Sequence, residues 1–292
     1  MLSRLARVSL GICLTAGLPA CSGDGSGRSD RTGGYGYVIV LQSPDPEYGL
    51  CAAGYWRAPS ADLEARTCDE VELDEADQDC QVTNCPANDD LEYLPAGTLT
   101  VEGGLRQLEL TPDEDVLYSD FGGLIFEGGE EIDIEVTGGD TVPPHSASVV
   151  APARIEATQP DFTQPMPLDL SQDFTASWDG AGTGRVSLTV SGELLTGGTT
   201  RYVSARCEFL RESGQGTIPA SVLHAMTDGG EVESPHVWLE AAEESETGPP
   251  GWNVGIRVGW SQEARIESDG GAGGSGGEQT GGLPGTAGAP GD

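Results

Sequence analysis

Strict alternation of apolar and polar residues constrains this chain most. From Trp252 to Trp260, every second residue is large and apolar, while Arg257 and small or polar residues occupy the positions between. A period of two predicts a half-buried antiparallel strand, with Ile256 facing a core and Arg257 facing solvent. The same period recurs in residues 132–136, 186–190 and 203–209.

Glycine and proline divide these strand patterns into short pieces. The 292 residues include 44 Gly and 19 Pro, and Gly-Gly pairs separate several of the alternating segments. Many short strands with such turns predict an all-β, antiparallel β-sandwich rather than a fold of alternating strands and helices. The one helix expected spans residues 219–226, where Pro219 suits the first helical position.

The N-terminus has the pattern of an export signal. Arg4 and Arg7 precede the apolar segment 8–18, which is too short to span a membrane as a helix. The following sequence, Leu18-Pro19-Ala20-Cys21, resembles the lipobox of bacterial lipoproteins. The resemblance implies that Cys21 receives a diacylglyceryl group and begins the mature chain. Ser22 at the next position then favours the outer membrane, while an ordinary secretory signal is the alternative.

Composition predicts the domain organisation. Residues 1–20 are expected to be the signal peptide, 21–36 a flexible tether and 268–292 a disordered glycine-rich tail. The remaining chain is long enough for one large or two modest sandwiches. The expected division is an N-terminal, cysteine-containing β domain at 37–158 and a C-terminal β-sandwich at 159–267.

Several strand and turn segments resemble those of uncharacterised bacterial outer-membrane lipoproteins. They are residues 174–178, 184–190, 207–209 and 216–223. The resemblance implies immunoglobulin-like β-sandwich domains. It brings no activity, because none is assigned to that group.

The cysteines predict disulfides. Beyond Cys21, the expected mature chain has Cys51, Cys68, Cys80, Cys85 and Cys207. An exported protein is exposed to oxidising conditions, so we expect Cys51–Cys68 and Cys80–Cys85 bridges, which close short loops, and a buried free thiol at Cys207. Zinc binding by four cysteines is the weaker alternative, because their spacing lacks the paired short knuckles of zinc sites.

The charge pattern narrows the possible partners. The chain has 14 basic and 48 acidic residues, a net charge of −34, so it repels nucleic acid. Residues 62–92 are densely acidic and are read as a solvated loop, with a calcium site as the alternative.

No pattern of catalytic residues stands out. The histidines, His145, His224 and His236, are not placed beside a nucleophile, and no cofactor or metal site is expected. Tyr and Trp residues concentrate between positions 35 and 56, where they either stack on a sugar or cap the edge of a core. The sequence therefore predicts a non-catalytic binding or structural module, anchored to the membrane through Cys21, with a protein or glycan partner. A carbohydrate- or calcium-binding adhesin-like module is the alternative, and a hydrolase is less favoured.

Overall fold

A computed structural model describes residues 34–57, 68–73, 77, 79–86, 93–113, 117–180, 182–196, 199–227, 230–264 and 266. Residues 1–33, including Cys21, and the whole tail, residues 268–292, lie outside this part. The regular secondary structure of the described chain is almost entirely β, as the alternation predicts. It has one α-helix, α2 (Ala220–Thr227), and a short 3₁₀ turn, η2 (Arg211–Ser213). None of its helices is long and apolar enough to cross a membrane.

One nine-stranded sheet organises the molecule, in the order β3-β4-β13-β12-β15-β16-β1-β2-β7. All its neighbours are antiparallel except β1 and β16, which are parallel. Its strands are β1 (Tyr35–Gln42), β2 (Gly49–Trp56), β3 (Asp69–Val71), β4 (Cys80–Pro86), β7 (Tyr118–Phe121), β12 (Arg185–Thr196), β13 (Thr199–Leu210), β15 (Glu231–Thr247) and β16 (Asn253–Ala264).

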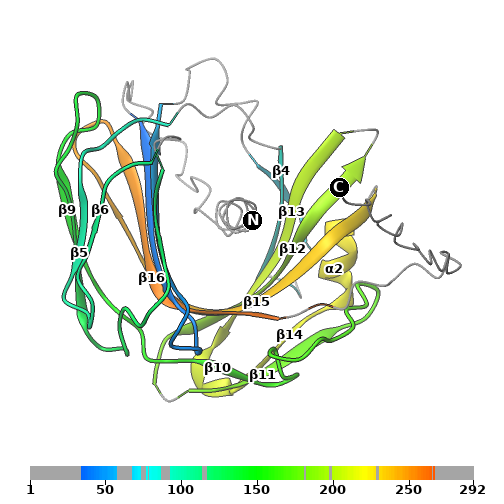
Figure 1. The fold of residues 1–292 in the computed structure, drawn as a ribbon. Coiled ribbons are helices and arrows are strands. Elements are labelled where there is room, and N and C mark those ends of the chain that lie inside the picture. Colours follow the sequence, from blue (N-terminus) through cyan, green and yellow to red (C-terminus); the bar gives the residue numbers. More distant parts are fainter. Residues whose placement is uncertain are drawn as a thin grey trace, which may run out of the picture.

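The large sheet is strongly bent. In Figure 1, β1 and β16 form one wall, β12, β13 and β4 form the other, and β15 runs between them. Two smaller sheets lie outside this bend. One has the order β6-β5-β8-β9, and the other β10-β11-β14. Their strands are β5 (Leu99–Glu102), β6 (Leu108–Leu110), β8 (Glu131–Val136), β9 (His145–Val150), β10 (Glu156–Gln159), β11 (Phe174–Asp179) and β14 (Gln215–Ile218).

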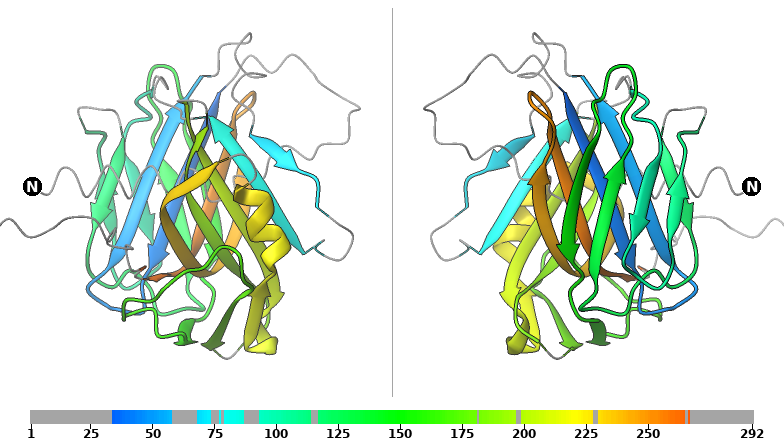
Figure 2. Two further views of the ribbon diagram at one scale, coloured as in Figure 1. Left: turned by 90° about the vertical axis from the view of Figure 1, so that its right-hand side faces the viewer. Right: turned by 90° about the vertical axis from the view of Figure 1, so that its left-hand side faces the viewer.

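The main core fills the space between the outer face of the large sheet and the smaller sheets. The apolar positions of β16 belong to it: Val254, Ile256 and Val258 are at most 1% exposed, which confirms the predicted orientation of this strand. Trp260 meets Phe126 edge to face, with ring centroids 5.7 Å apart. Helix α2 closes the core beside β4 and β13 with its buried residues Val222, Leu223 and Met226 (Figure 2). Packed antiparallel sheets thus confirm the all-β prediction, while the immunoglobulin-like type stays a prediction.

The expected division between residues 158 and 159 needs correction. Strand β1 pairs with β16 and β4 pairs with β13, so strands from both expected domains alternate within one sheet. The core is shared as well, because Val38 from the first part and Val258 from the second belong to one apolar cluster. Hydrogen bonds of one continuous sheet therefore cross the boundary that composition suggested.

Candidate binding face

The inner face of the large sheet, turned away from both smaller sheets, is the candidate functional surface. Successive side chains of a strand point to opposite faces, so every residue between two core positions lies here. On β16 these residues include Arg257, and on β1 they include Tyr37 and Ile39. The register pairs Ile39 with Arg257, so an apolar half and a charged half meet along the β1–β16 boundary.

The apolar half is a cluster of aromatic and aliphatic residues separate from the main core. Trp56 is its centre. It stacks on Tyr35 at 6.2 Å and meets Tyr37 at 6.1 Å and Tyr93 at 6.2 Å between ring centroids. Gly54 makes room for this packing, because a Cβ atom there would come within 2.9 Å of the Tyr37 and Tyr93 rings. Tyr35 and Tyr93 remain partly exposed at the edge of the cluster.

The charged half is a chain of ion pairs that crosses four adjacent strands. Arg257 on β16 pairs with Glu240 at 2.5 Å and with Glu244 at 3.3 Å, both on β15. Arg206 on β13 reaches Glu244 at 3.7 Å and Glu208 at 3.3 Å. A further pair at 3.2 Å joins Glu208 to Arg185 on β12. These six residues are called the ion-paired row below.

The Arg257–Glu240 pair corrects the expectation that Arg257 faces solvent. The two side chains are only 10% and 8% exposed. The alternation correctly assigned Arg257 to the face opposite the core. This face is the concave side of the bent sheet, however, so long side chains from neighbouring strands converge over Arg257 and bury it. Taking two charges out of water is costly, and the pair compensates by direct contact through Arg257 Nε.

Hydroxyl groups and one aromatic pair occupy the inner face beside the ion-paired row. Ser187, Thr189 and Ser191 are the inward residues of β12 and are buried. On β15, the rings of His236 and Trp238 stack at 6.2 Å with an interplanar angle of 23°. His236 Nδ1 lies 2.5 Å from a carboxylate oxygen of Glu263 on β16.

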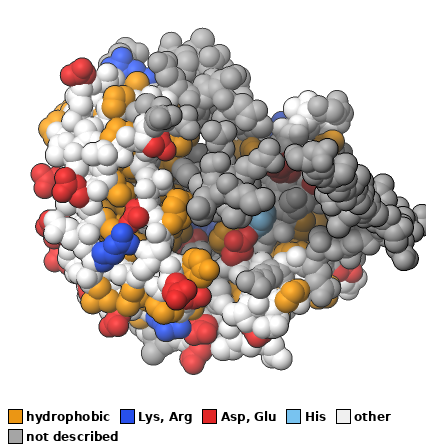
Figure 3. Space-filling model, viewed as in Figure 1, with side chains coloured by type: hydrophobic (Ala, Val, Ile, Leu, Met, Phe, Trp, Pro, Cys, Tyr) orange, Lys and Arg blue, Asp and Glu red, His pale blue; other side chains and the backbone are white. Residues whose placement is uncertain are grey.

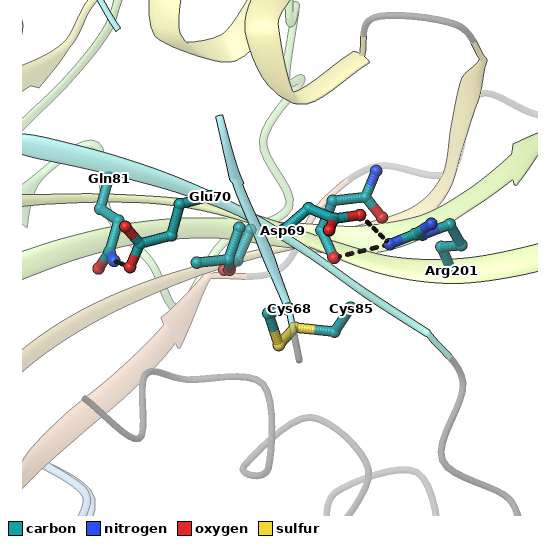
Figure 4. The surroundings of a disulfide bond; sticks show 9 residues. Cys68, Asp69, Glu70, Gln81, Cys85 and Arg201 are labelled. Carbon is teal, nitrogen blue, oxygen red and sulfur yellow. Dashed lines mark hydrogen bonds and ion pairs between the residues drawn. A yellow bond between two sulfur atoms is a disulfide. The ribbon is translucent and has the colours of Figure 1, made fainter. Parts of the chain in front are cut away.

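The described disulfides differ from the expected pairs. Cys68 bonds to Cys85, 17 residues away (Figure 4). Cys80 bonds to Cys207, 127 residues away. Cys80 and Cys85 cannot pair because they lie on one strand, β4, about 16 Å apart and on opposite faces. Instead, the register places Cys80 directly opposite Cys207 on β13.

Cys51 is a buried free thiol, not the partner of Cys68. It lies on β2, near one edge of the large sheet, whereas Cys68 precedes β3 at the other edge. The roles expected for Cys51 and Cys207 are therefore exchanged. Burial raises the pKa of the Cys51 thiol to about 12, so the reactive thiolate is scarce at neutral pH.

Thiol labelling tests this assignment. In the chain from residue 22 onward, iodoacetamide at pH 8 is expected to leave the native protein unmodified. In denaturant without reductant it should add one label, located at Cys51 by peptide mass spectrometry. Labelling of Cys207 instead would contradict the described pairs.

The other predicted positions do not assemble into a catalytic or metal site in the described part of the chain. His145 Nε2 lies 3.2 Å from the hydroxyl of the core residue Tyr55, and partial burial lowers the pKa of His145. His224 lies on α2 and lines an open groove of about 570 Å³ with Asp169 and Ser171. Among the described residues, no group of three or more His, Cys, Asp or Glu could hold a metal ion.

The acidic segment 62–92 is only partly described. Asp69 pairs with Arg201 at 2.7 Å, Glu70 accepts a hydrogen bond from Gln81 at 2.6 Å (Figure 4), and Asp77 accepts one from Ser221 at 2.8 Å. These carboxylates thus bind three separate partners. Over the surface seen in Figure 3, Asp and Glu side chains are scattered and Arg is sparse.

The aromatic residues predicted as one group are divided by the structure. Tyr35, Tyr37 and Trp56 meet on the inner face, whereas Tyr55 is in the main core and Tyr48 is 64% exposed in the turn after β1. Sequence reasoning missed Tyr93 and the ion-paired row. Part of the signal for the row was present in Arg206 and Glu208 at alternate positions of residues 203–209, and in Arg257 within residues 252–260.

Comparisons with known proteins give only distant similarity. No family model and no curated protein matches the chain. Among solved structures, a DUF4785 family protein of Legionella pneumophila has 10% identity and a TM-score of 0.21, covering 69% of this chain. A Ca²⁺-stabilised adhesin by which an Antarctic bacterium binds ice has 12% identity, a TM-score of 0.18 and coverage of 75% of this chain and 57% of that one. A 1.5-MDa bacterial ice-binding adhesin has 8% identity, a TM-score of 0.18 and coverage of 76% and 75%. The chain spans half the length of the Legionella protein, and scores this low support no functional argument.

Proposed function

We propose that the protein is a lipid-anchored, non-catalytic binding module of the bacterial outer membrane, and that the inner face of its large sheet takes the ligand. One observation carries the proposal. The inner face places an aromatic cluster directly beside a row of paired Arg and Glu residues, while the outer face already supplies the main core. Rings for stacking beside charged hydrogen-bonding groups are the composition of a recognition surface.

The cysteines support the extracytoplasmic location. The Cys68–Cys85 and Cys80–Cys207 disulfides fit an oxidising compartment. The lipobox-like sequence ending at Cys21 supports attachment to the membrane, because two or three acyl chains anchor a protein stably where one does not.

A Cys21→Ala variant tests the anchor. The unmodified protein is expected in the membrane fraction, with an acylated chain that begins at Cys21 by intact-mass measurement. The variant should move to the soluble fraction, because it lacks the sulfur that carries the lipid. Recovery of an unmodified wild-type chain that begins at another residue would refute the lipoprotein assignment.

A mixed array of oligosaccharides and peptides tests the binding role. The chain from residue 22 onward, with its disulfides formed, is expected to bind a defined subset of the probes. Arg206→Gln on the inner face should weaken this binding at least fivefold, because Arg206 links two carboxylates of the ion-paired row.

Arg154→Gln is the matched control. Arg154 forms an exposed pair with Glu156, in which both side chains are 51% exposed, outside the inner face. The Arg154→Gln variant should bind the same probes as strongly as the unmodified chain. Equal loss in both variants would remove the inner face as the binding surface, and binding to no probe would contradict the proposed function.

A further inference from the structure

Two buried hydrogen-bond donors on the inner face have no acceptor among the described residues. They are the Nε group of Arg206 on β13 and the indole Nε1 group of Trp238 on β15. A buried donor without an acceptor costs free energy comparable to a lost hydrogen bond, so native proteins hold few of them. These two therefore mark a place where an acceptor from outside the chain would stabilise the structure.

The sheet register places the two donor residues in one line across the sheet. Arg206 pairs with Thr189 on β12, and Thr189 pairs with Trp238 on β15. The three inward side chains thus form one line across three adjacent strands, with the Thr189 side chain between the two donors. Ser187 and Ser191 flank Thr189 along β12 and bring further hydroxyl groups to the same face. This line of Arg206, Thr189 and Trp238 is called the donor line below.

Carboxylates surround the donor line as acceptors. Glu208 and Glu244 contact Arg206, and Glu263 is the register partner of Trp238. A fitting ligand therefore accepts hydrogen bonds at the donor line and donates them to its border. Sugar hydroxyls do both at once.

The charges around the donor line favour a neutral ligand. The arginines of the ion-paired row already contact glutamates, and the whole chain has a net charge of −34. An anionic ligand would have to compete with these glutamates and overcome the repulsion of the protein. The aromatic cluster at Trp56 adds partly exposed rings, Tyr35 and Tyr93, on which a sugar face can stack.

We propose that the donor line is a subsite for a neutral oligosaccharide. This rests on the proposed function and adds the ligand class and the residues that read it. A peptide is less suited, because peptide ligands gain affinity from apolar anchors in pockets, and Trp238 is the one large ring among the neighbours of Thr189, whose others are Ser187, Ser191 and Arg206.

Titration calorimetry with defined oligosaccharides tests the proposal. The neutral probes are cellohexaose, maltohexaose, xylohexaose and the N-acetylglucosamine hexamer. The anionic probes are hexagalacturonate and a heparin hexasaccharide. At least one neutral probe is expected to bind, and the anionic probes at least tenfold more weakly. Trp238→Phe keeps the aromatic ring but removes the donor, and it should weaken binding about 5–10-fold, the loss of one net hydrogen bond.

Three further variants separate a direct contact from a folding defect. Thr189→Val should weaken the same binding, and Thr189→Ser, which keeps the hydroxyl, should restore most of it. Thr175→Val is the matched control, because the Thr175 hydroxyl bonds to Thr217 on a smaller sheet, 2.8 Å away, and should leave binding unchanged. Circular dichroism and thermal melting verify that each variant folds.

The outcomes distinguish this inference from the proposed function. Binding of peptides without any neutral oligosaccharide, or neutral binding that Trp238→Phe and Thr189→Val leave unchanged, would overturn the subsite while the binding role stands. Preference for the anionic probes would overturn the charge argument and the ligand class with it. Binding of no probe of any class would overturn both proposals.

Discussion

Replacing Arg257 with methionine is expected to lower the free energy of unfolding by about 3–5 kcal/mol. Its guanidinium lies 2.5 Å from Glu240, and the two side chains are 10% and 8% exposed. Without Arg257, the Glu240 carboxylate would stay buried without its closest countercharge, which is the costly way to break a buried ion pair. Urea unfolding followed by tryptophan fluorescence measures the change.

A second substitution separates the ion pair from packing. In Arg257→Met with Glu240→Leu, no lone charge remains, so the double variant should be more stable than Arg257→Met alone. Arg154→Met is the exposed control, and its pair with Glu156 should be worth less than about 1 kcal/mol. If Arg257→Met and Arg154→Met lower the free energy of unfolding by the same amount, the interpretation of Arg257 and Glu240 as a buried ion pair is wrong.

Removing the Cys80–Cys207 disulfide is expected to have the other large effect. The bond closes a loop with a sequence separation of 127 residues, and the chain-entropy account gives about 5 kcal/mol for a loop of this length. The Cys68–Cys85 bond has a separation of 17 residues, for which the same account gives about 3 kcal/mol.

Paired alanine variants measure the two contributions. Cys80→Ala with Cys207→Ala should lower the melting temperature more than Cys68→Ala with Cys85→Ala. Both pairs should leave Cys51 as a buried thiol, so labelling in denaturant serves as the control on the remaining bond. The reverse order of stability would indicate that the long loop is held by the sheet alone.

The alternation of apolar and polar residues was sufficient to predict the strands that have one apolar face and one polar or solvent-exposed face. Residues 132–136 and 203–209 lie within β8 and β13, and the helix expected at 219–226 is α2, displaced by one residue. Strands β1 and β2 were not predicted, although each has eight residues. Both of their faces are packed, so β1 reads as the nearly continuous apolar run Tyr35–Gln42 and gives no period of two.

The candidate site could be predicted only in part, because alternation assigns a residue to a face and does not reveal what that face meets. Arg257 was placed on the correct side and was wrongly expected in solvent, since the bend of the sheet is a tertiary property. Predicting the disulfide pairs also required tertiary information, namely which strands are neighbours in the sheet. Short loops favoured Cys80–Cys85, yet only the register between β4 and β13 brings Cys80 to Cys207.

The parallel contact between β1 and β16 has a consequence for the order in which the molecule can form. The order β15-β16-β1-β2 within the sheet makes β16 the bridge between β1, β2 and β7 on one side and all the other strands of the sheet on the other. Because β16 ends at Ala264, these two parts of the sheet cannot be joined to each other until almost the whole folded region has been synthesised. Such non-local pairing gives the chain a high contact order, which slows folding. We therefore expect the large sheet to close as one of the last steps of folding, after the residues of β16 are available.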